Sequence, residues 1–596
     1  QDDYTLGRAN GLPVYSPVDD TGCLTRTADL PEEQQIPDEL VGKQILERKG
    51  KCEANDAVIE VLKAGNRLAF EERYEHSYPH CWRSKTPVIF RAMDQWFVNI
   101  DHDGFRDKAL AAIEGVNWLP GWGRNRIEGA IKSRPDWCIS RQRSWGVPIP
   151  AFYDAQGEPI LDARIVRKTA DLVQEHGSNV WFERDFADLW AAVKPDDWDG
   201  AEPVAKSTDT LDVWIDSGSS SRAVLMQRSE LGRPGAEAGS TDAWQADYYL
   251  EGSDQHRGWF QSSLLLSLAG NGVAPYRNVL THGFMVDADR EKISKSKQAG
   301  GYAKPQTAEA YVGNYGADIV RLWVASQDFR NDITVSEERI KKVAEAYRGI
   351  RNAFRYQLSN LYDFDPAQHT VADGELTGLD RWILDAFAKL DADVRAAFDK
   401  CEFHIAYQRI TQFVSVELSA VYHDTVKDRL YTSPANSTRR RSTQTAIYRL
   451  VQGFPKMLSP MIVFTADEAW EAIPHLDSSS VHLADWEPFE SRFSDEELAD
   501  WKTMFAIRER VLPGLEEARQ AKRIGKSLEA RVTLTGSGRE LEIGQAHQED
   551  LRELINVSQL TLEAGEFVAV LHLPKSTAGL PSAYVKSRVR GSIDFP

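Results

Sequence analysis

The sequence has few cysteines and no long apolar run, and each absence argues against a class of protein. Five cysteines occur among 596 residues, and no two of them form a C-x-x-C pair. The sequence therefore predicts neither a disulfide framework nor a sulfur-rich zinc site. No uninterrupted apolar stretch of about 18 residues is present, which argues against a membrane-spanning helix. These features favour a soluble protein of a reducing, cytoplasmic compartment, with no membrane partner.

A secretory leader is also missing, and the charge is of the wrong sign for a general polyanion binder. The chain opens with Gln1-Asp2-Asp3-Tyr4, without the basic and apolar regions of a signal peptide, and we expect the start of the parent protein to be absent. The 71 basic and 90 acidic residues give a net charge of −19. This balance disfavours non-specific nucleic-acid binding but leaves room for a local basic path.

The length predicts several domains, and two sequence patterns divide them. Up to about residue 335, short apolar runs alternate with Gly and Pro breaks, as in α/β domains, and the acidic, Trp-bearing stretch 154–204 is interpreted as a loop-like insertion. From Ser336, a candidate helix cap, apolar residues recur at helical spacing and predict an antiparallel bundle. Alternation after Ser527 predicts strands in a small α+β unit. The expected fold is multidomain, α/β followed by all-α.

A short basic segment is the most informative motif. Lys292 and Lys295 lie three residues apart beside Ser294. Ammonium groups on a loop can stabilise the charge that builds up on a triphosphate during attack at its α-phosphate. The same pattern occurs by chance in solvated surface loops, so this segment alone leaves both interpretations open.

Upstream, residues 249–260 have a pattern that predicts the end of an apolar strand, then a turn containing Gly and acidic residues, and then a helix. In doubly wound sheets, ligands bind at the carboxyl ends of strands, where an acidic side chain can take ribose hydroxyls. The segment therefore favours a nucleotide pocket. The alternative is a capped turn in which His256 and Trp259 only pack.

Together these segments resemble the catalytic core of class I aminoacyl-tRNA synthetases, in particular the isoleucyl group. The resemblance covers roughly residues 1–535 and includes the segments 76–83, 134–143, 212–218, 316–319, 459–461 and 466–470. It implies a Rossmann-type core and a helical anticodon-binding domain. The implied domains are the C-terminal part of an editing domain (1–110), the second half of the catalytic core (111–335, with the lysine loop at 291–296), the helical domain (336–520) and a small α+β region (521–596).

The resemblance also implies roles for single residues. Lys295 would contact ATP, which acts with Mg²⁺, and Lys292 would support the same loop. The adenylate would be bound around its ribose and along its pocket by Glu251, Gly252, Asp254, Gln255, His256 and Ser294. Trp214 and Trp259 would form walls for the isoleucine side chain.

The first residues resemble the tail of an editing motif, in which Asp3 would hold the amino group of a mischarged amino acid. Editing is expected because isoleucine and valine differ by one methylene, and binding alone discriminates poorly against the loss of one methylene.

The chain also departs from the family pattern. The His-x-Gly-His segment that binds ATP phosphates in this class does not occur, nor do the two C-x-x-C pairs of the bacterial zinc module, and residues 297–304 differ from the usual continuation. We therefore expect an N-terminally truncated synthetase that is inactive in aminoacylation as a fragment. No zinc is predicted.

Two further clusters have alternative interpretations. His76, His80 and Cys81 could suggest a metal site, but Pro79 breaks any helix that would align them, so we expect packing and no metal. A basic run lies within and just after a loop between bundle helices, and it predicts phosphate contacts to tRNA, with a solvated charged face as the alternative. Its members are Lys427, Arg429, Arg439, Arg440 and Arg441.

The expected reaction joins isoleucine and ATP to isoleucyl-adenylate and then transfers the acyl group to isoleucine tRNA, by a monomeric enzyme. A valyl-type synthetase is the alternative within the class, and the segment 212–218 disfavours it. A non-catalytic tRNA-binding or trans-editing protein is the alternative from another class.

Overall fold

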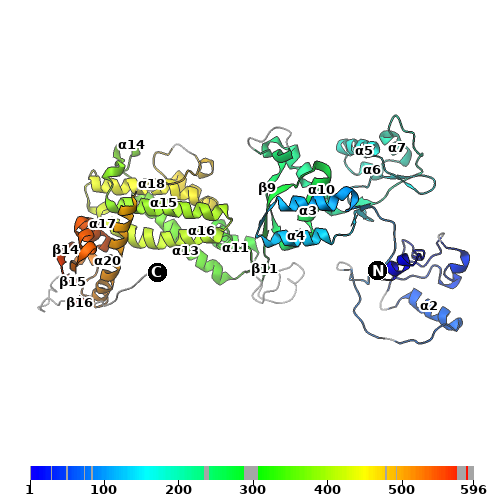
Figure 1. Ribbon diagram of the computed structural model, residues 1–596, viewed down its shortest axis with the longest axis horizontal. Helices are drawn as coiled ribbons and strands as arrows, with labels where there is room; N and C mark the ends of the chain where they lie inside the picture. Colours follow the sequence, from blue (N-terminus) through cyan, green and yellow to red (C-terminus); the bar gives the residue numbers. More distant parts are fainter. Residues whose placement is uncertain are drawn as a thin grey trace. The chain divides into compact units, whose positions relative to one another are not determined.

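The structure is a computed structural model that describes the chain except for residues 1, 28–29, 48–50, 73, 82–84, 234–240, 287–306, 477–478, 491–492, 573–584 and 588–596. The chain divides into two compact units, shown in Figure 1. The first comprises Gln1–Tyr249 and Asp254–Leu280, and the second comprises Leu250–Ser253 and Thr281–Pro596.

The first unit opens with two helices, α1 (Asp2–Ala9) and α2 (Glu53–Ala64), and little other regular structure before β1 (Phe97–Val98). Its main body contains a sheet with the strand order β2-β10-β9, formed by β2 (Asn117–Leu119), β9 (Ala246–Gly252) and β10 (Tyr276–His282). β2 and β10 run parallel, with Val279 opposite Trp118. Three helices pack with this sheet around one buried core, α3 (Phe105–Glu114), α4 (Trp122–Lys132) and α10 (Trp259–Asn271).

The insertion at 154–204 is folded, which corrects the loop-like interpretation. It contains α5 (Ala163–His176), α6 (Val180–Glu183), α7 (Phe186–Val193) and the strand β6 (Pro159–Ile160). β6 forms a sheet with two strands that flank the insertion, β5 (Phe152–Tyr153) and β7 (Ala205–Lys206). Its tryptophans are the physical reason, because Trp181 and Trp190 are buried with Phe152 in a separate small core. Acidic residues lie on the surface of this insertion, so its composition alone is typical of a solvated loop.

Short elements connect this insertion to the sheet. The strand pairs are β1 with β3 (Trp137–Cys138) and β4 (Ser140–Arg141) with β8 (Thr210–Leu211). Two short helices follow directly, α8 (Val213–Gly218) and α9 (Ser220–Ala223).

The second unit contains the helical bundle that the periodicity predicts. Ser336 caps α13, because its Oγ accepts a hydrogen bond from the backbone N–H of Arg339 at 3.4 Å. The predicted apolar faces are buried, including Ile340, Ile350 and Phe354. The helices are α11 (Ala308–Tyr315), α12 (Ala317–Ala325), α13 (Glu337–Ser359), α14 (Pro366–His369), α15 (Gly378–Asp399), α16 (Phe403–Phe413), a π-helix (Val414–His423), α17 (Asp424–Thr432), α18 (Thr438–Leu458), α19 (Val463–Glu471) and α20 (Asp495–Gln520).

The second unit also includes residues 281–335, which precede the predicted helical domain. β11 (Met285–Val286) pairs with β12 (Ile333–Thr334), and both lie in this unit. The reason is packing, since Leu322 and Trp323 of α12 belong to the same buried core as the helices that follow.

The small terminal α+β region packs on the same core. Its strands have the order β14-β13-β15-β16, and Val532 and Leu534 of β13 are buried, as the alternation predicts. The elements are β13 (Arg531–Gly536), α21 (Gly538–Ala546), α22 (Gln548–Ile555), β14 (Gln559–Ala564), β15 (Val568–His572) and β16 (Val585–Ser587). Within the described ranges, no helix is long and apolar enough to cross a membrane.

Candidate active site

In the second unit, the ends of β9 and β10 bring a carboxylate and an imidazole together. Glu251 Oε2 accepts a hydrogen bond from the backbone N–H of Gly252 at 3.0 Å. His282 Nε2 lies 3.9 Å from the same oxygen, and its Nδ1 lies 2.7 Å from the carbonyl oxygen of Gly283. Both side chains remain about half exposed. Exposed acceptors and donors at carboxyl strand ends suit the hydroxyl groups of a ribose.

Sequence reasoning missed His282. The available signal was its position at the end of the apolar run Val279–Leu280, which forms a buried strand beside β9. The carboxyl ends of neighbouring parallel strands meet at one edge of a sheet, so a polar residue there is a site candidate.

The 3-10 turn Ser253–Arg257 contains Asp254, Gln255 and His256, and their side chains have different environments. Asp254 is exposed. Gln255 caps α10, because its Oε1 accepts a hydrogen bond from the backbone N–H of Trp259 at 2.8 Å.

His256 does not line a pocket, which corrects its assignment to the adenylate site. Its side chain is fully buried, and its ring lies 6.0 Å from that of Trp118, 5.7 Å from that of Trp122 and 5.4 Å from that of Phe260. The packing alternative for His256 is the one that the structure supports.

The two tryptophans assigned to the amino-acid pocket meet at the contact between α8 and α10. Trp259 donates its indole N–H to the carbonyl oxygen of Ser217 at 2.9 Å, and its ring stacks on Tyr249 with centroids 4.1 Å apart. Trp214 lies against Gly258, where an added Cβ would come within 2.9 Å of its ring. Trp214 keeps 39% of its surface exposed, so an apolar ring face is available to a ligand.

Buried Asp212 fixes the start of α8 and therefore the position of Trp214. Its carboxylate accepts hydrogen bonds from the backbone N–H of Trp214 at 3.4 Å and from the indole N–H of Trp137 at 3.3 Å. Arg141 pairs with it at 3.0 Å. Burial and the negative charge of Asp212 raise the pKa of the neighbouring Asp216.

Several of the predicted site residues, or their side chains, lie outside the part of the chain that the structure describes. The lysine loop, with Lys292, Ser294 and Lys295, lies outside the described residues. Asp3 lies in α1, but its side chain is also outside the described part. The roles of these residues stay predictions.

The structure corrects the assignment of Arg440 and Arg441 as phosphate contacts. Both side chains are buried near the start of α18, with 4% and 7% of their surface exposed. Arg440 forms two hydrogen bonds to the carboxylate of Asp363, at 2.7 and 2.9 Å. Arg439 is 46% exposed but pairs with Glu553. A guanidinium already paired inside a bundle is not free to neutralise a phosphate.

The histidines at positions 76 and 80 are both exposed. Their rings contact tyrosines, with Tyr74 and His76 tilted at 5.0 Å and His80 edge-on to Tyr78 at 6.4 Å. Among the residues that the structure describes, no group of three or more His, Cys, Asp or Glu side chains could hold a metal ion.

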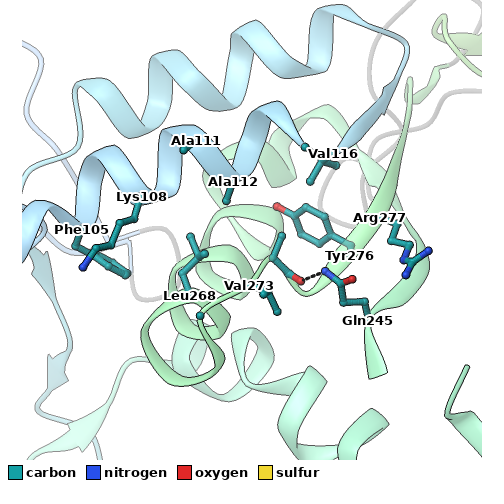
Figure 2. A pocket seen from close by; sticks show the side chains of 13 residues that line it. Phe105, Lys108, Ala111, Ala112, Val116, Gln245, Leu268, Val273, Tyr276 and Arg277 are labelled. Carbon is teal, nitrogen blue, oxygen red and sulfur yellow. Dashed lines mark hydrogen bonds between the residues drawn. The ribbon is translucent and has the colours of Figure 1, made fainter. Parts of the chain in front are cut away.

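The first unit also has an open cavity of about 920 Å³ that contains none of the predicted site residues. Figure 2 shows its lining, with Phe105 and Lys108 of α3 on one side and Val273 and Tyr276 on another. Gln245 donates its side-chain N–H to the carbonyl oxygen of Ala274 at 2.7 Å. The cavity therefore lies beside the amino end of β10, away from the carboxyl end where His282 stands.

Two known families match the chain, one in each half. Residues 21–336 match the tRNA synthetases class I (I, L, M and V), and residues 380–534 match the anticodon-binding domain of tRNA ligase.

Bacterial isoleucine–tRNA ligases are similar over most of the chain. The protein from Syntrophotalea carbinolica is 44% identical over 94% of this chain and 58% of its own length. The protein from Geobacter sulfurreducens is 44% identical over 96% and 59%. The protein from Nitrosococcus oceani is 45% identical over 90% and 53%. The chain thus spans little more than half the length of these relatives.

Proposed function

This chain belongs to the class I tRNA synthetases of the isoleucine, leucine, methionine and valine group, and from that membership we propose that it acts as an isoleucine–tRNA ligase. The observation that carries the proposal is the 44% identity to an isoleucine–tRNA ligase over 94% of the chain. The reaction would form isoleucyl-adenylate and pyrophosphate from isoleucine and ATP, and then transfer the acyl group to the terminal adenosine of isoleucine tRNA.

In this proposal the enzyme acts by positioning and by electrostatic stabilisation. Glu251, Gly252 and Asp254 would hold the ribose of the adenylate. Lys295, supported by Lys292, would stabilise negative charge on the triphosphate of ATP, which enters as its Mg²⁺ complex. Trp214 and Trp259 would present ring faces to the isoleucine side chain. The exposed ring of Trp214 and the exposed carboxylates of Glu251 and Asp254 support these roles.

We also propose hydrolytic editing of mischarged valine, with Asp3 holding its ammonium group. A carboxylate forms a charge-assisted hydrogen bond to an ammonium group, which suits this recognition.

Amino-acid-dependent exchange of pyrophosphate into ATP tests the function. We expect isoleucine to support exchange with a higher kcat/KM than valine, because the additional methylene of isoleucine gains binding energy in an apolar pocket. Preference for valine or leucine would contradict the isoleucine assignment. The assay uses the full-length protein, and the wild type must support exchange with at least one amino acid for the comparison to hold.

Gly258→Ala is expected to weaken isoleucine binding. The new Cβ would lie 2.6 Å from Gln255 Oε1 and 2.9 Å from the Trp214 ring, so the indole must shift. A displacement of this size in a binding wall should raise the KM for isoleucine by about tenfold to a hundredfold, and leave the KM for ATP nearly unchanged. Steady-state pyrophosphate exchange measures both constants.

Gly129→Ala is the matched control. Gly129 lies in α4, where a Cβ would meet open space, so both constants should match the wild type. An unchanged isoleucine KM in Gly258→Ala would show that Trp214 is not part of the amino-acid pocket.

A further inference from the structure

Buried arginines hold the turn that follows α13 in a fixed conformation. The carboxylate of Asp363 accepts hydrogen bonds from Arg440 at 2.7 and 2.9 Å and from the side chain of Gln444 at 2.8 Å. Arg441 donates to the backbone carbonyl of Asp363 at 2.9 Å. The Arg440 guanidinium lowers the pKa of Asp363 to about 2, so this carboxylate stays charged at neutral pH.

This rigid turn displays an uncovered aromatic ring. Tyr362 keeps 81% of its surface exposed, and the Arg440 guanidinium carbon lies 6.0 Å from its ring centroid. Arg440 also donates from Nε to the carbonyl oxygen of Leu430 at 3.2 Å. The next residue on α17, Tyr431, is 65% exposed. One buried arginine thus supports two segments that each present a tyrosine to solvent.

The two tyrosines lie at one end of the helical bundle. α13 begins three residues after β12, and its 23 residues extend about 35 Å before the turn with Tyr362. Within the second unit, Figure 1 shows β11 and α11 at one end, and α14 and α17 at the other. Tyr431 falls in the segment that matches the anticodon-binding domain, whereas Tyr362 precedes that segment.

We propose that Tyr362 and Tyr431 are stacking platforms for unpaired bases of the anticodon loop of isoleucine tRNA, an inference that rests on the proposed function. Proteins recognise single-stranded RNA by stacking splayed bases on aromatic rings. A ring held by a fixed turn loses little freedom on binding, which favours affinity.

The test uses the full chain and an anticodon stem-loop of isoleucine tRNA with 2-aminopurine in the loop. We expect the wild type to quench the 2-aminopurine fluorescence on binding. Tyr362→Ala and Tyr431→Ala should each raise the Kd about tenfold and reduce the quenching, whereas Tyr362→Phe and Tyr431→Phe should keep both near wild type because the ring remains. Phe464→Ala is the matched control. Phe464 is 66% exposed on α19, which packs with α12, and its replacement should change neither the Kd nor the quenching.

Each contrary outcome identifies what has failed. Wild-type affinity in both alanine variants would overturn the proposed platforms while leaving the ligase function intact. A phenylalanine variant that binds as poorly as the alanine variant would also overturn stacking, because the hydroxyl would then carry the contact. A wild-type chain that binds neither the stem-loop nor whole isoleucine tRNA would contradict the proposed function and this inference with it.

Discussion

In the full-length protein, Lys295→Ala is expected to slow the formation of isoleucyl-adenylate by about 10² to 10³, while the Kd for isoleucine tRNA changes less than about threefold. The lysine acts on charge that develops on the triphosphate only as the carboxylate of isoleucine attacks, so its loss should reduce the rate more than the binding of substrates. The magnitude is that of removing a single electrostatic donor from a transition state. Rapid-quench measurement of a single turnover isolates this step.

Lys297→Ala, two residues further along the same segment, is the matched control and should react at the wild-type rate. Lys295→Arg keeps the charge but changes its geometry, so an intermediate rate is expected. Wild-type adenylate formation by Lys295→Ala would show that the K-x-S-K pattern is only a solvated loop, which is the alternative that the segment by itself leaves open.

The helical half of the fold could be predicted because its sequence signals are local. Ile340, Ile350 and Phe354 recur at helical spacing, and the Ser336 hydroxyl that precedes them accepts the hydrogen bond of an N-cap. Such patterns depend on neighbours within one helix. They therefore do not need knowledge of what packs against that helix.

The roles of charged and polar residues could not be predicted in the same way, because their partners are far away in sequence. Arg440 pairs with Asp363 across 77 residues, which a basic run in the sequence does not reveal. His256 has the same difficulty, since Trp118 becomes its neighbour only when the sheet has formed. The insertion is a third case, in which a small aromatic core is hidden by an acidic composition.

Arg429 is the most consequential member of the predicted basic run, because it connects the bundle to the terminal α+β region from a buried position. Its side chain is 2% exposed and pairs with Asp380 of α15 at 3.1 Å and with Glu553 of α22. Asp380 is itself fully buried and also accepts hydrogen bonds from Tyr422 at 2.7 Å and Ser442 at 2.6 Å. The guanidinium therefore pairs with two carboxylates from separate elements, of which Glu553 is also paired with Arg439.

Arg429→Met is accordingly expected to lower the free energy of unfolding of the second unit by about 3 to 5 kcal/mol, because Asp380 loses its cation while fully buried, whereas Glu553 keeps its pair with Arg439. The matched control is Lys427→Met on the same helix, where an exposed pair with Asp424 should contribute less than about 1 kcal/mol. Urea unfolding of the chain, followed by tryptophan fluorescence, measures both changes.

A triple variant separates the loss of charge balance from the loss of packing. Asp380→Asn and Glu553→Gln, added to Arg429→Met, remove the negative charge of both carboxylates, so the stability lost through the uncompensated charge of Asp380 should partly return. If Arg429→Met were as stable as Lys427→Met, the carboxylates must find other partners or protons in the folded protein. If the triple variant were no more stable than Arg429→Met, the guanidinium would act through its hydrogen bonds to Thr377 and Thr443, at 2.9 Å each, and through packing rather than through its charge.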